Sequence, residues 1–251
     1  MCTLIVLYKL LKDYPVIALH NRYMEKDSEE YPPRRMGDVV CPIDAASGGT
    51  WIGCNGKGLL LAITNQETET LENPRRSRGL LALDVLRGCE TADDAKELLL
   101  DPATRAPYRS GNFVVVDEES GHHIVWDVDT HHFEVSPGLY TVGTVTVVPR
   151  IRWSERSRRI HEGSERRVSR ARELLSGFRP RSVDEAIEEL VKVSADHAYG
   201  KTESSICWHH PVNRQTSSTL IALGAEPRVY YCPGNHCESP YVDYSGVINS
   251  K

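Results

Sequence analysis

The sequence lacks several features that would assign it at once to a common class of proteins. No apolar run among its 251 residues approaches the roughly 20 residues that a membrane-spanning helix needs. It contains neither a G-x-x-x-x-G-K-[ST] loop nor a G-x-G-x-x-G turn, and its glycine-rich stretch GGTWIGCNGKG lies in an expected hairpin. The formal net charge of −5 also argues against a protein devoted to nucleic-acid binding. We therefore expect no membrane, nucleic-acid or nucleotide-phosphate partner.

The first residues lack the marks of an export signal. The stretch MCTLIVLYKLLKDYP has no basic leader, Lys9 and Lys12 interrupt its apolar residues, and no small-residue cleavage site follows. The seven cysteines are an odd number and are widely spread along the chain. Both observations predict a cytoplasmic protein whose thiols are mostly free.

What the sequence does contain is blocks of strands separated by pairs of helices. CTLIVLY and PVIAL are apolar on both alternating faces, which is typical of strands buried on both sides. TWIGCNGKGLLLAITN predicts two strands around an Asn55-Gly56 turn. Helices are expected at RGLLALDVLRGC, TADDAKELLL, about 154–177 and 183–197, and strands at NFVVVDE, HHIVWDV, HFEVS, LYTVGTV, SSICWHH, STLIALG and PRVYYC. This order predicts a layered α+β fold in one domain, residues 1–251.

Cys2 follows the initiator methionine directly. Methionine aminopeptidases remove Met1 when the second residue is small, and removal would leave a thiol and a free α-amine on one residue. An α-amine has a pKa of roughly 7.7–8.0, so it is substantially neutral near physiological pH and suits a general base for the thiol. On this evidence alone, a chance cysteine at the head of a buried strand is the better explanation of the start.

Four stretches together carry a resemblance: MCTLIVLY, ALHNRYMEKD, GGTWIGCNGKGLLLAITNQ and NRQTSSTLIAL. They resemble the N-terminal nucleophile (Ntn) hydrolase-like family that includes transport-and-Golgi-organisation protein 2, which is named for an Asn-Arg-Asp-Glu motif. More distantly the chain resembles the bile-salt hydrolase and penicillin V acylase group. The resemblance implies a four-layer αββα sandwich of the Ntn-hydrolase type, with the cysteine at the end of a central strand.

The resemblance also implies roles for individual residues. Cys2 would be the nucleophile, and Arg22 the arginine that favours its thiolate. Glu25 would be the carboxylate that anchors the α-amine. Asn65 would supply an oxyanion-hole amide, and Arg214 the late arginine that faces the site. Read without the resemblance, Arg22 and Glu25 suit a surface ion pair, Asn65 a turn, and Arg214 a solvated position.

The sequence departs from the family pattern at two points. The motif is here Asn21-Arg22-Tyr23-Met24-Glu25, so the acid is displaced. A second asparagine, expected after the PG-Y turn, is absent, and Thr144 stands nearest to its place. The Thr144 hydroxyl would donate one hydrogen bond to the substrate, but it is shorter than the asparagine side chain expected there.

Two other groups of residues suggest binding sites: the Cys- and His-containing stretches near the C-terminus and an arginine-rich stretch. CWHH and CPGNHC contain candidate zinc ligands, but they lack a paired C-x2-C knuckle, and the Pro-Gly step favours a plain turn. If this turn lies over the mouth of the site, His236 would contact substrate. We therefore predict no metal and no cofactor; the candidates set aside are Cys207, His209, His210, Cys232, His236 and Cys237. The arginine-rich stretch 150–181 predicts a solvated helix laced with ion pairs, although an anion-binding patch stays open.

The predicted function is an N-terminal-cysteine amidohydrolase or acylase. It would cleave a linear carbon-nitrogen amide bond, as in an N-acyl amino acid, through a thioester acyl-enzyme. The alternative is a non-catalytic protein on the same scaffold that handles haem or an acyl or lipid ligand, as the resemblance implies for some relatives. The oligomeric state stays open, a homo-oligomer included.

Overall fold

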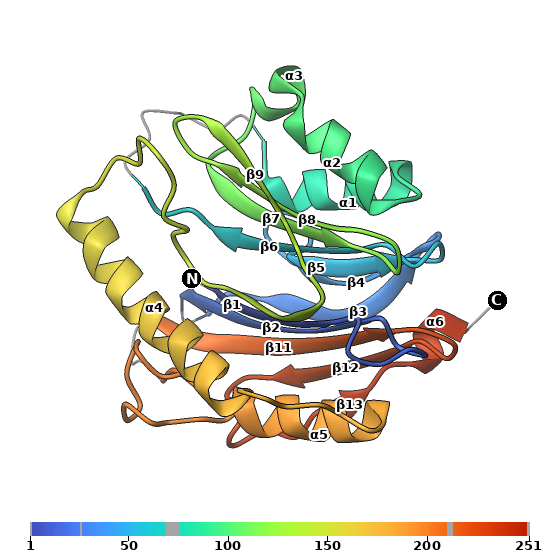
Figure 1. The fold of residues 1–251 in the computed structure, drawn as a ribbon. Coiled ribbons are helices and arrows are strands. Elements are labelled where there is room, and N and C mark those ends of the chain that lie inside the picture. Colours follow the sequence, from blue (N-terminus) through green and yellow to red (C-terminus); the bar gives the residue numbers. More distant parts are fainter. Residues whose placement is uncertain (1, 26, 69–75, 210–212, 250–251) are drawn as a thin grey trace. The chain divides into compact units, whose positions relative to one another are not determined.

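The computed structural model describes residues 2–25, 27–68, 76–209 and 213–249 (Figure 1). The chain forms two compact units, each built on one antiparallel sheet. The first unit comprises Met1–Ser28, Pro137–Gly143 and Glu162–Lys251, and the second comprises Glu29–Ser136 and Thr144–His161. No helix in the described parts of the chain has both the length and the apolar character that crossing a membrane requires.

The sheet of the first unit has the strand order β10-β1-β2-β11-β12-β13. Its strands are β1 (Cys2–Tyr8), β2 (Val16–Glu25), β10 (Gly138–Val142), β11 (Asn213–Leu223), β12 (Arg228–Pro233) and β13 (Val242–Asp243). All seven residues of β1 are buried, as its uninterrupted apolar sequence predicts. The amino-terminal strand therefore lies inside the sheet, between β10 and β2.

Two helices, α4 (Glu155–Leu174) and α5 (Val183–Ser194), cover one face of this sheet (Figure 1). Ile5 and Leu7 of β1 and Leu19 of β2 pack in one cluster with Ala171 of α4 and Leu190 of α5. The hydroxyl of Ser182 accepts a hydrogen bond from the backbone N–H of Glu185 and so caps the start of α5. A short helix, α6 (Gly246–Asn249), follows β13.

The sheet of the second unit has the strand order β3-β4-β5-β6-β7-β8-β9. Its strands are β3 (Glu30–Met36), β4 (Val39–Asp44), β5 (Ile52–Asn55), β6 (Leu60–Asn65), β7 (Gly111–Val116), β8 (Gly121–Trp126) and β9 (Thr130–Glu134). Helices α1 (Arg78–Gly88) and α2 (Ala92–Leu100) pack on it, and α3 (Pro102–Arg105) follows. Thr91 and Asp94 form the full capping box of α2.

The two glycines of the GGTW stretch have different structural reasons. Gly48 has φ +69°, a conformation that favours glycine. Gly49 lies so close to α1 that an added Cβ would meet the backbone carbon of Gly79 at 2.3 Å. The backbone N–H of Thr50 donates to the carbonyl of Gly79 at 3.0 Å, so this stretch is tied directly to the first turn of α1.

Most of the predicted elements are confirmed, with three differences. The β5–β6 hairpin, α1, α2, α4 and the strands β7 to β10 occur where the sequence predicts them. The strand predicted at SSICWHH is wrong, because residues 204–207 form turns and bends. Helix α5 ends at Ser194 rather than at 197. The strands β3, β4 and β13 and the short helices α3 and α6 were not predicted. That the chain is a single domain stays a prediction.

Candidate functional site

The thiol of Cys2 lies at the end of β1, on the face of the sheet that carries Arg22. Cys2 pairs directly with Arg22 in the antiparallel register of β1 and β2, and Leu4 pairs with His20. Paired residues share a face of the sheet, and so do residues two apart along a strand. Cys2, Arg22 and His20 are therefore neighbours on one face, with exposed fractions of 7%, 5% and 0%.

Strand β11 extends this polar face. Ser217 pairs with Arg22 and Thr219 pairs with His20, so both hydroxyl side chains belong to the same face as the thiol. Both are fully buried, and within the described parts of the chain neither hydroxyl oxygen has a hydrogen-bond partner. Two buried hydroxyl groups beside Arg22 and His20 are thus open to a bound polar group.

The electrostatic surroundings lower the pKa of the Cys2 thiol from 9.0 to about 6. Burial by itself raises this pKa, because it disfavours the thiolate. The opposing effects are larger in sum. They are, in order of size, the charge of His20, the charge of the amino-terminal amine, a hydrogen bond between the His20 and Cys2 side chains, and the charge of Arg22. At neutral pH Cys2 is therefore predominantly ionised, which is the state of a nucleophilic cysteine.

Tyr23 follows Arg22 in β2, so its side chain lies on the opposite face of the sheet from the Cys2 thiol. The Tyr23 hydroxyl donates to the carbonyl of Ile206 at 2.5 Å, and its ring packs edge-on against Trp208. Arg167 of α4, which is fully buried, lies over the Tyr23 ring at 5.1 Å and donates to the hydroxyl of Thr3 at 3.0 Å. Tyr23 thus belongs to the packing beneath the helices, and Arg167 is the exception in a helix predicted to be solvated.

Glu25 lies at the carboxyl end of β2, and Arg214 lies near the amino end of β11. Glu25 is exposed and is the last residue of β2, where it pairs with Asn213. It is an odd number of residues from Arg22, which places it on the other face of a regular strand. Arg214 pairs with Met24 through its backbone, and its side chain lies outside the described part of the structure. The roles predicted for both residues stay predictions.

Asn65 ends β6 in the second unit, and both ends of its amide have partners. Its Oδ1 accepts a hydrogen bond from Arg78 at 2.8 Å, and its Nδ2 donates to Glu67 at 2.9 Å. Arg78 also donates to the carbonyl of Ser110, so the guanidinium is itself held in place. A primary amide has two N–H groups, and the contact with Glu67 uses one of them. Arg78 therefore fixes which end of the amide carries the remaining donor.

Thr144 lies next to Asn65 through the backbone. The N–H of Val145 donates to the carbonyl of Asn65 at 3.2 Å, and Thr144 is fully buried. Val145 has φ 72°, a strained conformation for a β-branched residue that costs about 1–3 kcal/mol. Backbone strain of this kind concentrates at functional sites, and here it lies between Thr144 and the Asn65 carbonyl.

A buried network of hydrogen bonds holds the segment around Thr144 against the end of β6 at Asn65. Gln66 accepts from the N–H of Thr146 at 2.8 Å and donates to Asp127 at 2.7 Å. Asn112 donates to the Asn65 carbonyl at 2.9 Å and accepts from the Thr146 hydroxyl at 2.6 Å. Asn112 is a buried asparagine near Thr144 in this unit, but these contacts occupy its amide. It therefore does not replace the asparagine whose absence the sequence indicated.

The family model described as Transport and Golgi organisation 2 matches residues 1–237. The chain belongs to this family. None of the curated proteins matches it in sequence. The family assignment confirms the resemblance that the Met-Cys start, NRYME and GGTWIG…AITN carry.

Several solved structures are similar to this family member in fold. An N-acylethanolamine-hydrolysing acid amidase ortholog of Caenorhabditis elegans is 12% identical, with a TM-score of 0.58 over 88% of this chain and 92% of the other. Penicillin V acylase from Agrobacterium tumefaciens is 13% identical, with a TM-score of 0.57 over 100% and 88%. A mutant of conjugated bile acid hydrolase from Clostridium perfringens is 14% identical, with a TM-score of 0.58 over 100% and 95%. The predicted Ntn-hydrolase fold class is confirmed.

The structure thus groups the predicted site residues into two sets in this family member. Cys2 and Arg22 are direct neighbours in the first unit, and Asn65 and Thr144 are neighbours in the second. That the two sets act together stays a prediction. His20 was missed by the sequence reading, although its spacing of two from Arg22 along a strand was a signal that both share a face.

Proposed function

We propose that this protein is an N-terminal-cysteine hydrolase that cleaves a linear carbon-nitrogen amide bond after loss of Met1. One observation carries the proposal: the Cys2 thiol lies beside Arg22 and His20 on one buried face, and its pKa is lowered to about 6. A thiolate at the first position of the mature chain has no other evident use in a buried strand, where an uncharged thiol packs better. The hydrolase-like scaffold of the fold relatives supports the same function.

The proposed reaction has two steps. In the first, the Cys2 thiolate attacks the carbonyl carbon, a C–S bond forms, and the C–N bond breaks as the leaving amine takes up a proton from the protonated α-amine of the mature Cys2. In the second, water attacks the thioester, the C–S bond breaks, and the acid is released. The α-amine, neutral after the first step, accepts a proton from the attacking water, and the sulfur leaves as the thiolate.

The charge that develops on the carbonyl oxygen needs donors. The free N–H of the Asn65 amide, oriented by Arg78, is the proposed side-chain donor. His20 contributes most to keeping Cys2 ionised, with a smaller contribution from Arg22. Arg22, Ser217 and Thr219 are proposed to donate hydrogen bonds to a polar group of the substrate. Thr144 is proposed as a weaker substrate contact, and Glu25 as an anchor of the α-amine.

The test combines the mass of the chain with turnover of a substrate panel. We expect purified protein to lack Met1 and to hydrolyse at least one of four classes of amide: N-acyl amino acids, N-acylethanolamines, penicillin V and conjugated bile acids. Cys2→Ala is expected to abolish that hydrolysis, whereas Cys89→Ala, which removes a buried thiol of the second unit, is expected to retain it. Active protein that keeps Met1, or full activity in Cys2→Ala, would show the proposal to be wrong.

A second function is favoured by the contacts of the predicted oxyanion donors. Asn65 already has partners at both ends of its amide, and Thr144 replaces an asparagine. A site with few free donors suits a protein that binds haem or an acyl ligand without hydrolysing it. Haem titration distinguishes the two functions: binding requires a stoichiometric shift of the Soret band that is lost in Cys2→Ala or His209→Ala. His210, a second candidate ligand for the haem iron, lies outside the described residues.

A further inference from the structure

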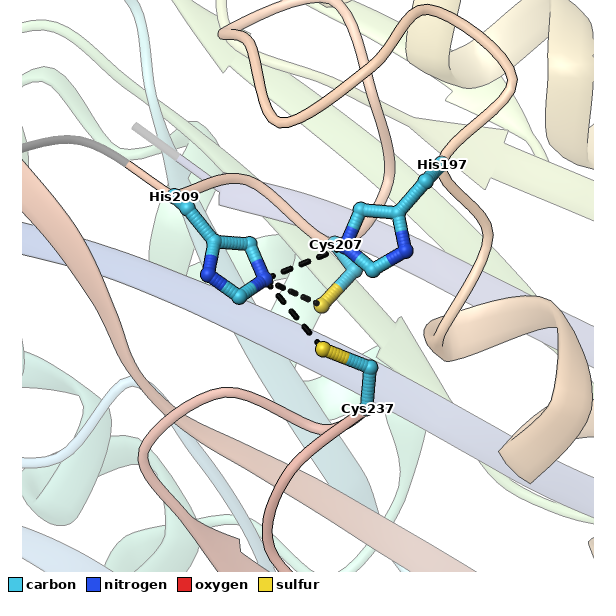
Figure 2. A group of neighbouring side chains, drawn as sticks. All are labelled: His197, Cys207, His209 and Cys237. Carbon is cyan, nitrogen blue, oxygen red and sulfur yellow. Dashed lines mark hydrogen bonds between the residues drawn. The ribbon is translucent and has the colours of Figure 1, made fainter.

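Four side chains of the first unit bring their ligand atoms close together. They are His197, Cys207, His209 and Cys237, and their nitrogen and sulfur atoms all lie within 4.8 Å of one another. Figure 2 shows the two imidazole rings and the two sulfur atoms turned toward a common point. The Nε2 of His209 lies 3.0 Å from the Nε2 of His197. It lies 3.5 Å from the Cys207 sulfur and 3.2 Å from the Cys237 sulfur.

These separations match those of donors around one zinc ion. Zinc binds imidazole nitrogen at about 2.0–2.1 Å and thiolate sulfur at about 2.3 Å, usually as a tetrahedron. Tetrahedral angles then place two nitrogens about 3.3 Å apart, and a sulfur and a nitrogen about 3.6 Å apart. Two histidines and two cysteines are also a donor set that favours zinc over calcium or magnesium, which prefer oxygen ligands.

The donors come from two loops that the fold holds in place. His197, Cys207 and His209 belong to the segment that follows α5, where the backbone N–H of Cys207 donates to the carbonyl of Asp196 at 3.0 Å. Cys237 belongs to the turn after β12, where the N–H groups of Glu238 and Ser239 both donate to the carbonyl of Asn235. The site would therefore join the two loops.

The Nδ1 of His209, on the far side of its ring, faces two polar side chains. It lies 3.1 Å from the Nδ2 of Asn235, which is a donor, and 3.7 Å from a carboxylate oxygen of Glu238. Metal-binding histidines almost always donate their other ring N–H to a carboxylate or carbonyl oxygen, which keeps the metal-facing nitrogen free of a proton. Within the described residues the Oδ1 of Asn235 has no partner, so turning this amide over would place an acceptor against Nδ1 and give the tautomer that a metal ligand needs.

We propose that His197, Cys207, His209 and Cys237 bind one zinc ion in a structural site. Four protein ligands fill a tetrahedron and leave no open position for a substrate or for activated water. The two thiols release their protons on binding, as thiolate ligands do. The ion would clamp the loop after α5 to the turn after β12. This clamp lies close to the start of β11, the strand that carries Ser217 and Thr219.

The neighbouring cysteine and histidine that the sequence suggested are not part of the set. The sulfur of Cys232 contacts the carbonyl of Ser239 at 3.2 Å, and the Nδ1 of His236 contacts the carbonyl of Ser194 at 3.2 Å. The C-x4-C spacing of Cys232 and Cys237 therefore does not form the site. Cys232, which lies in β12 just before this turn, therefore provides a control.

The first experiment measures zinc bound per chain by elemental analysis, after expression with zinc and gel filtration under reducing conditions. We expect one equivalent in the full chain and in the controls Cys232→Ser and His131→Gln. We expect Cys237→Ser and His197→Gln, which change partly exposed side chains, to retain less than a tenth of an equivalent. Loss of zinc in Cys232→Ser with retention in Cys237→Ser would overturn the assignment.

The second experiment identifies the ligands through cobalt(II), added to chelator-treated, reduced protein. We expect the ligand-field bands of tetrahedral cobalt and a sulfur-to-cobalt charge-transfer band. At saturating cobalt, which offsets the weaker binding, Cys237→Ser is expected to reduce the charge-transfer band by about half because one thiolate remains. Zinc is expected to bleach both signals at one equivalent. No tetrahedral cobalt spectrum, together with no retained zinc, would refute the proposal. The same holds if the two cysteines are found as a disulfide in protein kept under reducing conditions.

Discussion

The change His20→Gln tests the electrostatic account of the Cys2 thiol most sharply. Burial alone raises the pKa of Cys2, and the charge of His20 is the largest effect that opposes it. Glutamine keeps a hydrogen-bonding side chain of similar length but cannot carry a positive charge. The variant therefore removes the leading cause of the low pKa and leaves Arg22 and the strand pairing intact.

The size of the effect follows from the pKa values. A pKa of about 6 in place of 9.0 is a difference of about 4 kcal/mol between the two protonation states. At pH 7 it leaves about 90% of Cys2 as thiolate, whereas an unperturbed thiol would be about 1% ionised. We expect His20→Gln to raise the midpoint by at least about one pH unit, which leaves no more than about half of the thiol ionised at pH 7.

The assay follows alkylation of Cys2 by a small electrophile as a function of pH, read from the mass of the amino-terminal peptide. The midpoint is the quantity to compare, because a thiolate of lower pKa is also a weaker nucleophile and the absolute rates partly cancel. His131→Gln, which changes a histidine of the second unit, is the control and is expected to keep the midpoint near 6. A wild-type midpoint near 9, or an unchanged midpoint in His20→Gln, would refute the reasoning.

Three further predictions follow from the same structure. Since the folded pKa of Cys2 is depressed, its ionisation stabilises the fold fully above pH 9 and is lost as pH falls through 6; at pH 7 it contributes about 1.4 kcal/mol. Chemical unfolding should therefore show that Cys2→Ser flattens the rise in stability between pH 6 and 9, and an equal rise in the variant would contradict this. Gly49→Ala, whose new methyl meets the backbone of α1, should cost about 1–3 kcal/mol, or about 2–4 °C in Tm per kcal/mol, whereas Gly88→Ala has open space and should cost nothing. Arg78→Met should lower kcat on any hydrolysed amide at least about tenfold while the alkylation midpoint of Cys2 stays unchanged; a shifted midpoint would mean that Arg78 does not act through Asn65.

Local sequence signals predicted much of the fold because they act over a few residues. The stretch TADDAKELLL predicted α2, whose start Thr91 and Asp94 cap in the structure, and the Asn55-Gly56 turn predicted the β5–β6 hairpin. The strands β3 and β4 were missed because EYPPRRM contains two prolines and mixes exposed with buried positions. The strand predicted at SSICWHH was wrong because its apolar residues are buried without joining either sheet.

The sequence predicted that Cys2 and Arg22 belong to one site, but it did not identify His20, the residue with the largest effect on the Cys2 pKa among those that lower it. Cys2 and Arg22 came from the motif, and their direct pairing fits the predicted relation between them. His20 required the register of β1 and β2, because only the register shows which residues of β2 lie beside the thiol. Tyr23 was read as a disturbed motif, whereas the structure shows a packing residue beneath Arg167 and Trp208.

The proposed zinc ligands also could not be grouped from the sequence, because they are far apart along the chain. Cys207, His209 and Cys237 were visible as candidates, but the pairing of spacings typical of zinc sites was absent. His197 was hidden because the sequence placed it in the last turn of a helix, while α5 ends at Ser194 and releases the chain into the loop. Only the fold brings this loop to the turn after β12.

The most direct measurement of the central claim is the mass of the amino-terminal peptide after rapid quenching with a hydrolysed amide. The account predicts a chain that begins at Cys2 and carries the acyl group of the substrate on that residue, removable by a nucleophile that cleaves thioesters. An acyl group on any other residue, or turnover by protein that still begins with Met1, would contradict the account.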